Sequence, residues 1–277
     1  SLAATVLLGG CATTHQEPKE NPMSADKKQQ VVALLKSLET GDRAAASVID
    51  PNHYVQHNLA AGDGIAGLAA LLEHAPPGSI KVDTVRVFQD GDEVFAHSQY
   101  EFFGPKVGFD IFRFENGLIV EHWDNLQERP ARPNPSGRTM LDGPTQPGSP
   151  GVTASNKALV REFVETILVA GKMDRLGSFF EGDHYLQHNP QVADGLSGLG
   201  AALQAMAARG MTMKYDRVHK VLGEGDFVLT VSEGTLGDRP TSFYDLFRVD
   251  NGRIAEHWDT IEAIPPRADW KNGNGKF

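Results

Sequence analysis

An internal duplication constrains this chain more than any other feature of its sequence. The segment Tyr54–Asn58 (YVQHN) recurs as Tyr185–Asn189 (YLQHN). Other segments recur in the same order: Gly91–Val94 as Gly225–Val228, Phe109–Arg113 as Tyr244–Arg248, and Glu121–Asp124 as Glu256–Asp259. A period this long indicates two whole domains rather than a solenoid of short units.

The duplication divides the chain into two copies of one domain, here named repeat 1 (residues 29–127) and repeat 2 (residues 154–262). Residues 128–153 between them are rich in proline and glycine, which sustain neither a helix nor a central strand. This segment is therefore expected to be a linker. Residues 263–277 are expected to form a C-terminal tail.

Each repeat has the pattern of helices followed by strands. Apolar residues at three- and four-residue spacing predict a first helix over Val31–Leu38 and Leu159–Leu168, with Gly41 and Gly171 as stop signals. Helices followed by an antiparallel meander predict an α+β fold, with the helices on one face of a curved sheet. The other expected elements are helices Ile65–Leu72 and Leu196–Met206 and strands Lys81–Phe88, Glu93–Phe103, Phe109–Phe114, Leu118–Leu126, Met213–Leu222, Phe227–Gly234, Thr241–Val249 and Arg253–Ile261.

The last hairpin of each repeat is expected to close with a three-residue loop, Glu115–Gly117 or Asp250–Gly252, because glycine supplies a left-handed position there. Strand alternation then gives one face two carboxylates and an imidazole among apolar side chains, which is the composition of an acid/base pocket. In repeat 1 this face would hold Asp110, Phe112, Val120, His122 and Asp124. The opposite face would hold Phe109, Ile111, Arg113, Ile119, Glu121 and Trp123.

Two motifs, Tyr-x-Gln-His-Asn and Phe/Tyr-Asp-x-Phe-Arg-x-x-x-Gly-x-Ile-x-Glu-His-Trp-Asp, occur in both repeats. Together they resemble SnoaL-like domains of the nuclear transport factor 2-like superfamily, which includes bacterial proteins described as predicted aldol-condensation enzymes. The resemblance implies two tandem cone-shaped domains, each enclosing one pocket between helices and sheet. In polyketide-cyclase members the acid/base lies near the end of this last strand, which implies Asp124 and Asp259. Those members have a histidine on the neighbouring strand, where this chain has Asp110 and Asp245.

The candidate catalytic residues combine groups that can hold and accept a proton near neutral pH. We expect Asp124 to be the base in repeat 1, with His122 and Asp110 tuning it or donating a proton. Repeat 2 would use Asp259, His257 and Asp245. Expected substrate contacts are Tyr54, Gln56, His57, Asn58, His97 and Phe112 in repeat 1, and Tyr185, Gln187, His188, Asn189 and Phe247 in repeat 2.

Structural roles are the alternatives for several of these residues. The His-Asn pairs that follow the two glutamines could instead shape the backbone. The paired aspartates Asp110 and Asp245 could only accept hydrogen bonds. Arg113 with Glu121, and Arg248 with Glu256, fit cross-strand ion pairs on the outer face.

Three classes of function stay open. The first is an acid/base enzyme that acts without cofactor on a small carbonyl compound, by aldol, cyclase, isomerase or hydratase chemistry. The second is a lipoprotein that binds a small apolar molecule without catalysis. The third is a metalloprotein using His57, His97, His122 and Asp124, although no short His-x-His or His-x-x-x-His pair supports a metal. The favoured expectation is no cofactor and no metal.

Charge and cysteine content narrow the choice further. The chain has 26 Lys plus Arg against 36 Asp plus Glu, a net charge of -10, which argues against nucleic acid as a partner. Its 1 Cys excludes an internal disulfide. The sequence does not identify the substrate or show whether both pockets are active.

The N-terminal residues indicate export. The apolar run Leu2–Leu8 is too short to span a bilayer, and Leu8–Cys11 resembles the lipobox of bacterial lipoproteins. The resemblance implies cleavage before Cys11 and a lipid on its thiol, with residues 1–10 a signal-peptide remnant and residues 11–28 a polar tether. We thus expect an exported lipoprotein on the periplasmic or outer-membrane face, touching the membrane only through this lipid. Translation from Met23 would instead give a cytoplasmic protein.

The outer face of the last hairpin predicts how the repeats assemble. A surface formed by Ile111, Ile119 and Trp123 is too apolar to leave in water. We expect the two repeats to pair through these faces as an intramolecular pseudo-dimer. The alternative is that the linker or the termini cover the face.

Overall fold

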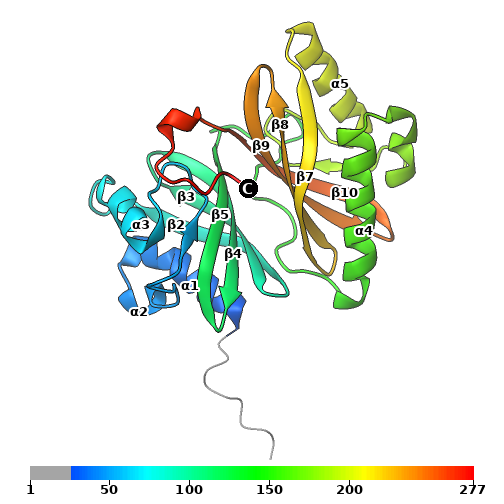
Figure 1. The fold of residues 1–277 in the computed structure, drawn as a ribbon. Coiled ribbons are helices and arrows are strands. Elements are labelled where there is room, and N and C mark those ends of the chain that lie inside the picture. The colour runs from blue at the N-terminus through cyan, green and yellow to red at the C-terminus, as the bar shows by residue number, and fades with distance from the viewer. Residues whose placement is uncertain (1–25) are drawn as a thin grey trace, which may run out of the picture.

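The computed structural model describes residues 26–277, which form two five-stranded sheets with helices (Figure 1). Repeat 1 contains α1 (Lys27–Thr40), α2 (Arg43–Ala46), β1 (Val55–Gln56), α3 (Gly64–Glu73), β2 (Lys81–Asp90), β3 (Glu93–Glu101), β4 (Pro105–Glu115) and β5 (Leu118–Glu128). The short helix η1 (Pro150–Val152) ends the linker. Repeat 2 follows with α4 (Thr153–Phe163), η2 (Val164–Val169), η3 (Met173–Phe179), β6 (Leu186–Gln187), α5 (Gly195–Ala208), β7 (Met213–Glu224), β8 (Phe227–Leu236), β9 (Arg239–Asp250) and β10 (Arg253–Ala263). A short helix, η4 (Arg267–Asp269), lies in the tail.

The strand order is β1-β5-β4-β3-β2 in one sheet and β6-β10-β9-β8-β7 in the other. The four long strands of each sheet form an antiparallel meander, and the short first strand pairs in parallel with the last. The predicted α+β class and tandem arrangement are confirmed. Strands β1 and β6 were not predicted, because two residues carry no periodic pattern. They hold the glutamines of the Tyr-x-Gln-His-Asn motifs.

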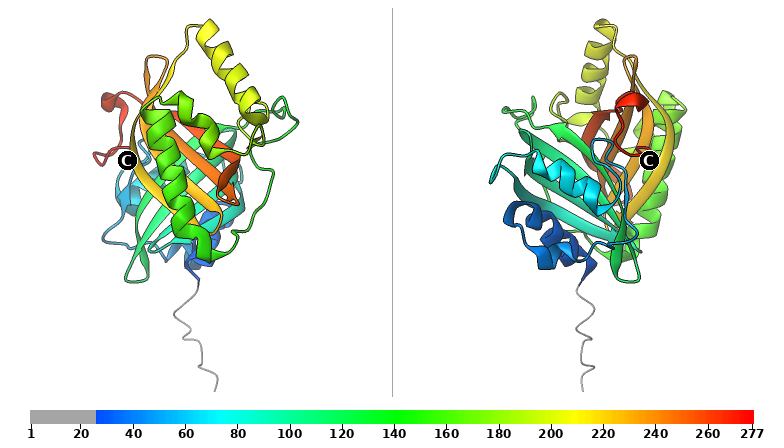
Figure 2. Two further views of the ribbon diagram at one scale, coloured as in Figure 1. Left: turned by 90° about the vertical axis from the view of Figure 1, so that its right-hand side faces the viewer. Right: turned by 60° about the vertical axis from the view of Figure 1, so that its left-hand side comes forward.

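Local chemistry accounts for the bounds of α1. The Asp26 carboxylate accepts a hydrogen bond from the backbone N–H of Lys28 at the start of the helix. Gly41 adopts φ 71° at the other end, a left-handed conformation that glycine adopts without a Cβ penalty. Between these caps Val31, Leu34 and Leu35 are buried in the core of repeat 1. The helix therefore covers the face of the sheet opposite repeat 2 (Figures 1 and 2).

The turn of the β4–β5 hairpin differs from the expected three-residue loop. Glu115 pairs with Leu118, which leaves a two-residue turn in which Asn116 and Gly117 both have positive φ. A bulge follows, so that Arg113 pairs with Glu121 and Val120 has no partner of its own. A three-residue loop would have paired Asp110 with His122, but Asp110 pairs with Asp124, so the expected register is wrong. The same turn and bulge recur in the β9–β10 hairpin.

The bulge also changes one predicted face. Ile119 was expected on the outer face with Ile111 and Trp123, but it packs in the helix-side core of repeat 1. Ile111 and Trp123 lie in a different cluster, shared by both sheets. Besides these two, this shared core contains Phe88, Phe95, Val107, Phe109, Met140, Leu222, Phe227, Leu229, Val231, Tyr244, Leu246 and Trp258. The sheets therefore face each other, with the helices on the outer flanks (Figure 1).

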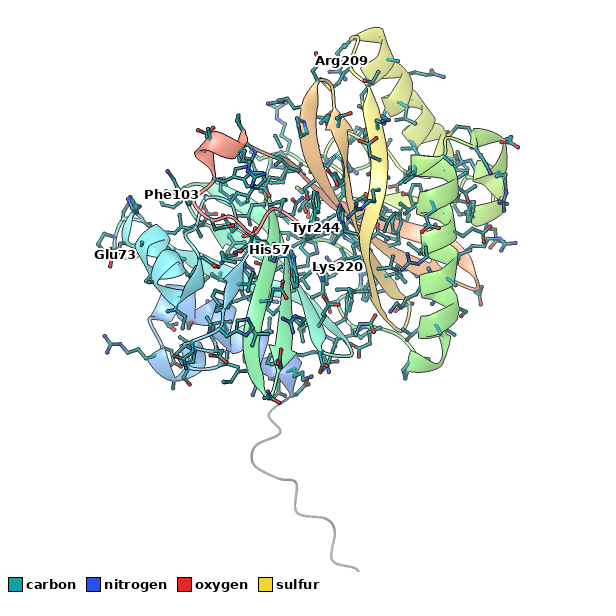
Figure 3. All side chains as sticks on the ribbon, viewed as in Figure 1. His57, Glu73, Phe103, Arg209, Lys220 and Tyr244 are labelled. Carbon is teal, nitrogen blue, oxygen red and sulfur yellow. The ribbon has the colours of Figure 1, made fainter. Side chains whose placement is uncertain are left out.

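Contacts between the sheets occur as reciprocal pairs. The Arg86 guanidinium of β2 lies 4.6 Å from the ring centroid of Trp258, and the Lys220 ammonium of β7 lies 3.8 Å from that of Trp123. Figure 3 shows Lys220 and Tyr244 in the region between the sheets. Carbonyl groups of the linker, at residues 141, 142 and 144, accept hydrogen bonds from Arg86. The linker therefore takes part in the contact between Arg86 of one sheet and Trp258 of the other.

Two further expectations concern the membrane. Within residues 26–277 no helix combines the length and apolar character needed to cross a bilayer. The lipobox at Cys11 lies outside the described residues, so the lipid anchor and the exported location stay predictions from the sequence.

The shared core predicts that the two repeats unfold together. Leu229→Ala should lower the free energy of unfolding by about 3 kcal/mol, because the side chain is fully buried and its removal leaves a cavity. Urea denaturation of variants retaining only Trp123 or only Trp258 would follow each repeat by fluorescence, and both probes should move together. The exposed control Met211→Ala should change stability by less than about 0.5 kcal/mol. If Leu229→Ala did not shift the urea unfolding transition reported by Trp123, the shared core would be contradicted.

Candidate active site

Three neighbouring strands bring the site residues of repeat 1 together. Antiparallel pairing sets Asp110 of β4 opposite Asp124 of β5, and sets Phe112 opposite His122. Parallel pairing of β1 with β5 brings Gln56 beside His122. Alternate residues of a strand share one face, and these residues point to the face covered by the helices, where they line a pocket.

Hydrogen bonds fix the proton on one nitrogen of His122. The Gln56 side-chain oxygen accepts the backbone N–H of Asn58 at 2.8 Å, which identifies it as the acceptor end of the amide. His122 Nδ1 lies 3.0 Å from this oxygen and must therefore donate to it. His122 Nε2 lies 3.0 Å from Asp110 Oδ1, so a further proton is shared between imidazole and carboxylate. This second proton is the one available for chemistry.

The two carboxylates of the cluster have different surroundings. Asp110 Oδ2 accepts a hydrogen bond from the Tyr100 hydroxyl at 2.7 Å. Asp124 Oδ2 accepts one from the Asn58 amide at 2.6 Å, whereas Asp124 Oδ1 is buried without a hydrogen-bond partner among the described residues. A buried carboxylate oxygen without a hydrogen bond is costly, so this atom marks Asp124 as the group poised to accept a proton.

Repeat 2 reproduces the arrangement. His257 Nδ1 lies 3.1 Å from the Gln187 oxygen, and His257 Nε2 lies 3.0 Å from Asp245 Oδ1. The Asn189 amide donates to Asp259 Oδ2 at 2.7 Å, and Asp259 Oδ1 is again buried without a hydrogen-bond partner within residues 26–277. In both clusters, therefore, the equivalent carboxylate oxygen has no hydrogen bond from the described residues.

A tyrosine hydroxyl contacts the paired aspartate in both repeats but comes from different strands. Tyr100 lies on β3, opposite Val82 of β2. In repeat 2 the contact to Asp245 comes from Tyr215 of β7, at 3.1 Å, and Gly234 stands opposite it on β8. The phenol has thus moved to the neighbouring strand, with glycine at the position it left. The duplication could not reveal either tyrosine, because the two do not align in sequence.

Burial dominates the electrostatics of the cluster. It raises the pKa of Asp110, although the hydrogen bond to His122 opposes this shift. It also raises the pKa of Asp259 to about 6, with the charge of Asp245 acting in the same direction and that of His257 against it. Burial disfavours a charge on His257, yet the hydrogen bond to Asp245 and the charges of Asp259 and Asp245 raise its pKa. Proton-holding and proton-accepting groups therefore coexist near neutral pH.

Each cluster lies at the end of a largely apolar pocket. The cavity has a volume of about 80 Å³ in repeat 1 and about 430 Å³ in repeat 2. Of the expected substrate contacts, Tyr54, Gln56, Asn58 and Phe112 line the first pocket, and Tyr185, Gln187, Asn189 and Phe247 line the second. The apolar walls of the first include Leu34, Leu38, Leu68, Leu72, Phe102 and Leu126. Such a pocket suits a small, mainly apolar molecule with one polar end.

Three predicted histidines lie elsewhere. His57 stacks on Trp123 and bonds to Glu121, and His188 stacks on Trp258 and bonds to Glu256. Both sit behind the sheet because they follow the glutamines by one residue, which turns their side chains to the other face.

His97, expected to line the first pocket, contacts Arg86 at 2.8 Å and Phe109 in the region between the sheets. It does not line the pocket. The expected cross-strand ion pairs do form, with Arg113 Nε 2.7 Å from Glu121 and Arg248 Nε 2.7 Å from Glu256.

The spacing of the cluster also bears on metal binding. Asp110, His122 and Asp124 each offer an atom within 4.8 Å of the others, a span that an ion could bridge. The contacts are nevertheless those of a proton-sharing site, because His122 and Asp110 lie at hydrogen-bond distance and the Lys276 ammonium lies 3.7 Å from Asp124. We interpret the cluster as a proton-binding site.

Comparison with known proteins identifies the domain. A family model for the SnoaL-like domain matches residues 31–122 and again residues 160–257. No curated protein matches the chain.

Solved structures with similar chains include an NTF-2 like protein of unknown function from Burkholderia xenovorans (19% identity, TM-score 0.33, covering 38% of this chain and 85% of that chain). Another is a protein of unknown function with a cystatin-like fold from Xanthomonas campestris (22%, 0.32, 38% and 89%). A third is an LEH-like epoxide hydrolase from M. tuberculosis (22%, 0.31, 40% and 84%).

The raised pKa of Asp259 predicts a pH-dependent cost in stability. An unfolded aspartate titrates near pH 3.9, so the folded chain binds the extra proton between about pH 4 and the folded value of about 6. Ionising the buried Asp259 lowers the free energy of unfolding. This loss is absent below about pH 4 and complete well above about pH 6. Asp259→Asn keeps an acceptor for Asn189 and should be more stable than the wild type by about 2 kcal/mol at pH 8.

Urea titrations at about pH 4 and pH 8 measure this difference, which should vanish at the lower pH. The exposed control Asp238→Asn should show no such change. An equal effect of Asp259→Asn at both pH values would contradict the raised pKa.

Proposed function

The chain belongs to the SnoaL-like domain family and carries the domain twice, and from the chemistry of its two clusters we propose that it is an acid/base enzyme. It acts without cofactor on a small carbonyl compound, in a reaction of the aldol, cyclase, isomerase or hydratase type. The proposed catalytic residues are Asp124, His122 and Asp110 in repeat 1 and Asp259, His257 and Asp245 in repeat 2.

The observation that carries the proposal is one buried carboxylate oxygen in each of Asp124 and Asp259 that has no hydrogen bond in the described part of the chain. Asp124 and Asp259 line the pockets, and in each the Oδ1 atom has no hydrogen-bond donor among the described residues while an asparagine holds the second oxygen. A pocket that only bound an apolar molecule would gain nothing from such an atom, which destabilises the fold. A base that removes a proton from bound substrate requires it.

The proposed reaction is a proton transfer in two steps. Asp124 Oδ1 takes a proton from the carbon next to the substrate carbonyl, and the electron pair of the broken C–H bond moves to the carbonyl oxygen. The proton shared by His122 Nε2 and Asp110 is donated to that oxygen, giving an enol. Return of the Asp124 proton to another carbon of a conjugated enol, with the enol O–H proton passing back to His122 and Asp110, completes an isomerisation. Attack of the enol carbon on a second carbonyl forms a carbon–carbon bond when the enol O–H proton returns to His122 and Asp110 and the Asp124 proton passes to the oxygen of the second carbonyl.

Hydrogen exchange at carbon tests this proposal. Small ketones and aldehydes in D₂O should lose their α-hydrogen NMR signals faster with the enzyme present. The double variant Asp124→Asn with Asp259→Asn should lower the rate at least about 100-fold, the contribution of a general base. The exposed control Asp174→Asn should retain wild-type exchange. Unchanged exchange in the double variant would rule out these aspartates as bases.

We also propose that the repeats correspond to the two subunits of a homodimer, related by a pseudo-twofold axis. Reciprocal contacts support this arrangement. The Glu262 side chain accepts the backbone N–H of Leu126, and the Gln127 side chain accepts that of Ile261. Each site is thus built beside the last strand of the other repeat.

A further inference from the structure

A segment that follows the last strand of one repeat crosses the site of the other. These segments are here named the linker strap (residues 134–142) and the tail strap (residues 271–277). The Asn134 amide donates to two backbone carbonyls of the loop that carries the repeat 2 motif. The Asn272 amide does the same in repeat 1. The straps are therefore equivalent in position.

The straps differ in length and sequence, but one contact aligns them residue by residue. The carbonyl of Thr139 in the linker strap contacts His188 Nδ1 at 2.8 Å, and that of Gly275 in the tail strap contacts His57 Nδ1 at 2.9 Å. The next residue is Met140 in the first strap and Lys276 in the second, and both are buried. An apolar side chain in one strap thus corresponds to a charged one in the other.

Lys276 reaches the repeat 1 site. Its ammonium donates to Glu262 at the end of β10 and lies 3.7 Å from Asp124 Oδ1. Burial alone would lower the pKa of Lys276, but the charges of Glu262 and Asp124 raise it, so the lysine is protonated. The counterpart of Glu262 in repeat 1 is the neutral Gln127, which contacts Ile261. Within residues 26–277 no lysine or arginine forms an ion pair with Asp259.

We propose that Lys276 is a positioning residue that holds Asp124 in its charged form, whereas in repeat 2 no lysine or arginine of the described residues pairs with Asp259. One chain then carries two sites of nearly identical side chains that work over different pH ranges. The claim about the charge stands apart from the reaction catalysed, and only its consequence for turnover rests on the proposed function.

The other groups near Asp124 do not replace this cation. Ionisable groups that face it come from every packed element: Tyr54 before β1, Tyr100 of β3, Asp110 of β4, His122 of β5, Tyr244 of β9, Glu262 of β10 and Lys276 of the tail. The tyrosines are neutral because burial raises their pKa. His122 shares its second proton with Asp110, so Lys276 is the cation left to balance Asp124 and Glu262.

Carboxyl-carbon NMR of the full chain labelled with ¹³C-aspartate tests the proposal without a substrate. Lys276→Met, which copies the linker strap, should raise the pH at which Asp124 titrates by about 1 unit or more, the effect of losing a nearby opposite charge. The Asp259 titration should not move. Lys276→Arg should restore the wild-type curve, and the exposed control Lys271→Met should leave it unchanged. An unmoved Asp124 curve in Lys276→Met would overturn the proposal.

A second variant keeps the test decisive if Lys276→Met does not fold. Glu262→Gln removes the competing carboxylate and can still accept the Leu126 N–H, as Gln127 does for Ile261. Lys276 then faces Asp124 alone, and the pH at which Asp124 titrates should fall. A rise or no change would overturn the proposal.

The consequence for turnover has its own readout. With Asp259→Asn only repeat 1 is active, and with Asp124→Asn only repeat 2. Activity of repeat 2 should decline as pH falls through about 6, where Asp259 takes up a proton, and repeat 1 should stay active to lower pH. If the two variants showed the same dependence of turnover on pH, this consequence would be overturned. Absence of turnover would count against the proposed function and leave the NMR result intact.

Discussion

The structure depends on how two carboxylates and an imidazole are buried together. A buried carboxylate without a partner is costly, and two of them beside a histidine can be accommodated only if a proton is shared. The Gln56 oxygen requires His122 to present its other nitrogen to Asp110, which fixes where that proton sits. The short strand β1 and its counterpart β6 have the role of delivering this glutamine. Asp124 Oδ1, and Asp259 Oδ1 in repeat 2, have no hydrogen bond within the part of the chain that the structure describes and are the atoms that these contacts leave for chemistry.

The duplication gives the cluster two environments within one folded unit. The sheets bury their outer faces against each other, so neither repeat presents its apolar face to water. The straps then cross from one repeat to the other, and one of their differences, Met140 against Lys276, places a buried cation beside the repeat 1 site. Stability and site chemistry are thereby linked, because the segments that complete each site also bridge the repeats.

The sequence predicted the fold class, the two tandem domains and which side chains of the last hairpin lie together in each repeat, because these depend on periodicity and on repeated motifs. It misjudged the hairpin register, since a two-residue turn followed by a bulge gives almost the same alternation as a three-residue loop and moves only Ile119 to the other face. His57 and His188 were misplaced because the faces of two-residue strands could not be read from the pattern. Tyr100, Tyr215 and Lys276 were missed because they have no aligned counterpart, and only the tertiary structure brings them to the clusters.

The position of the imidazole protons is the central claim, and ¹⁵N NMR of the histidine side chains measures it directly. At about pH 7.5 the account predicts that Nδ1 of both His122 and His257 carries a proton, with the second proton shared between Nε2 and the paired aspartate. Gln56→Leu should broaden or change the His122 signals and leave those of His257 as they are. A neutral imidazole protonated only at Nε2 in the wild-type chain would contradict the account.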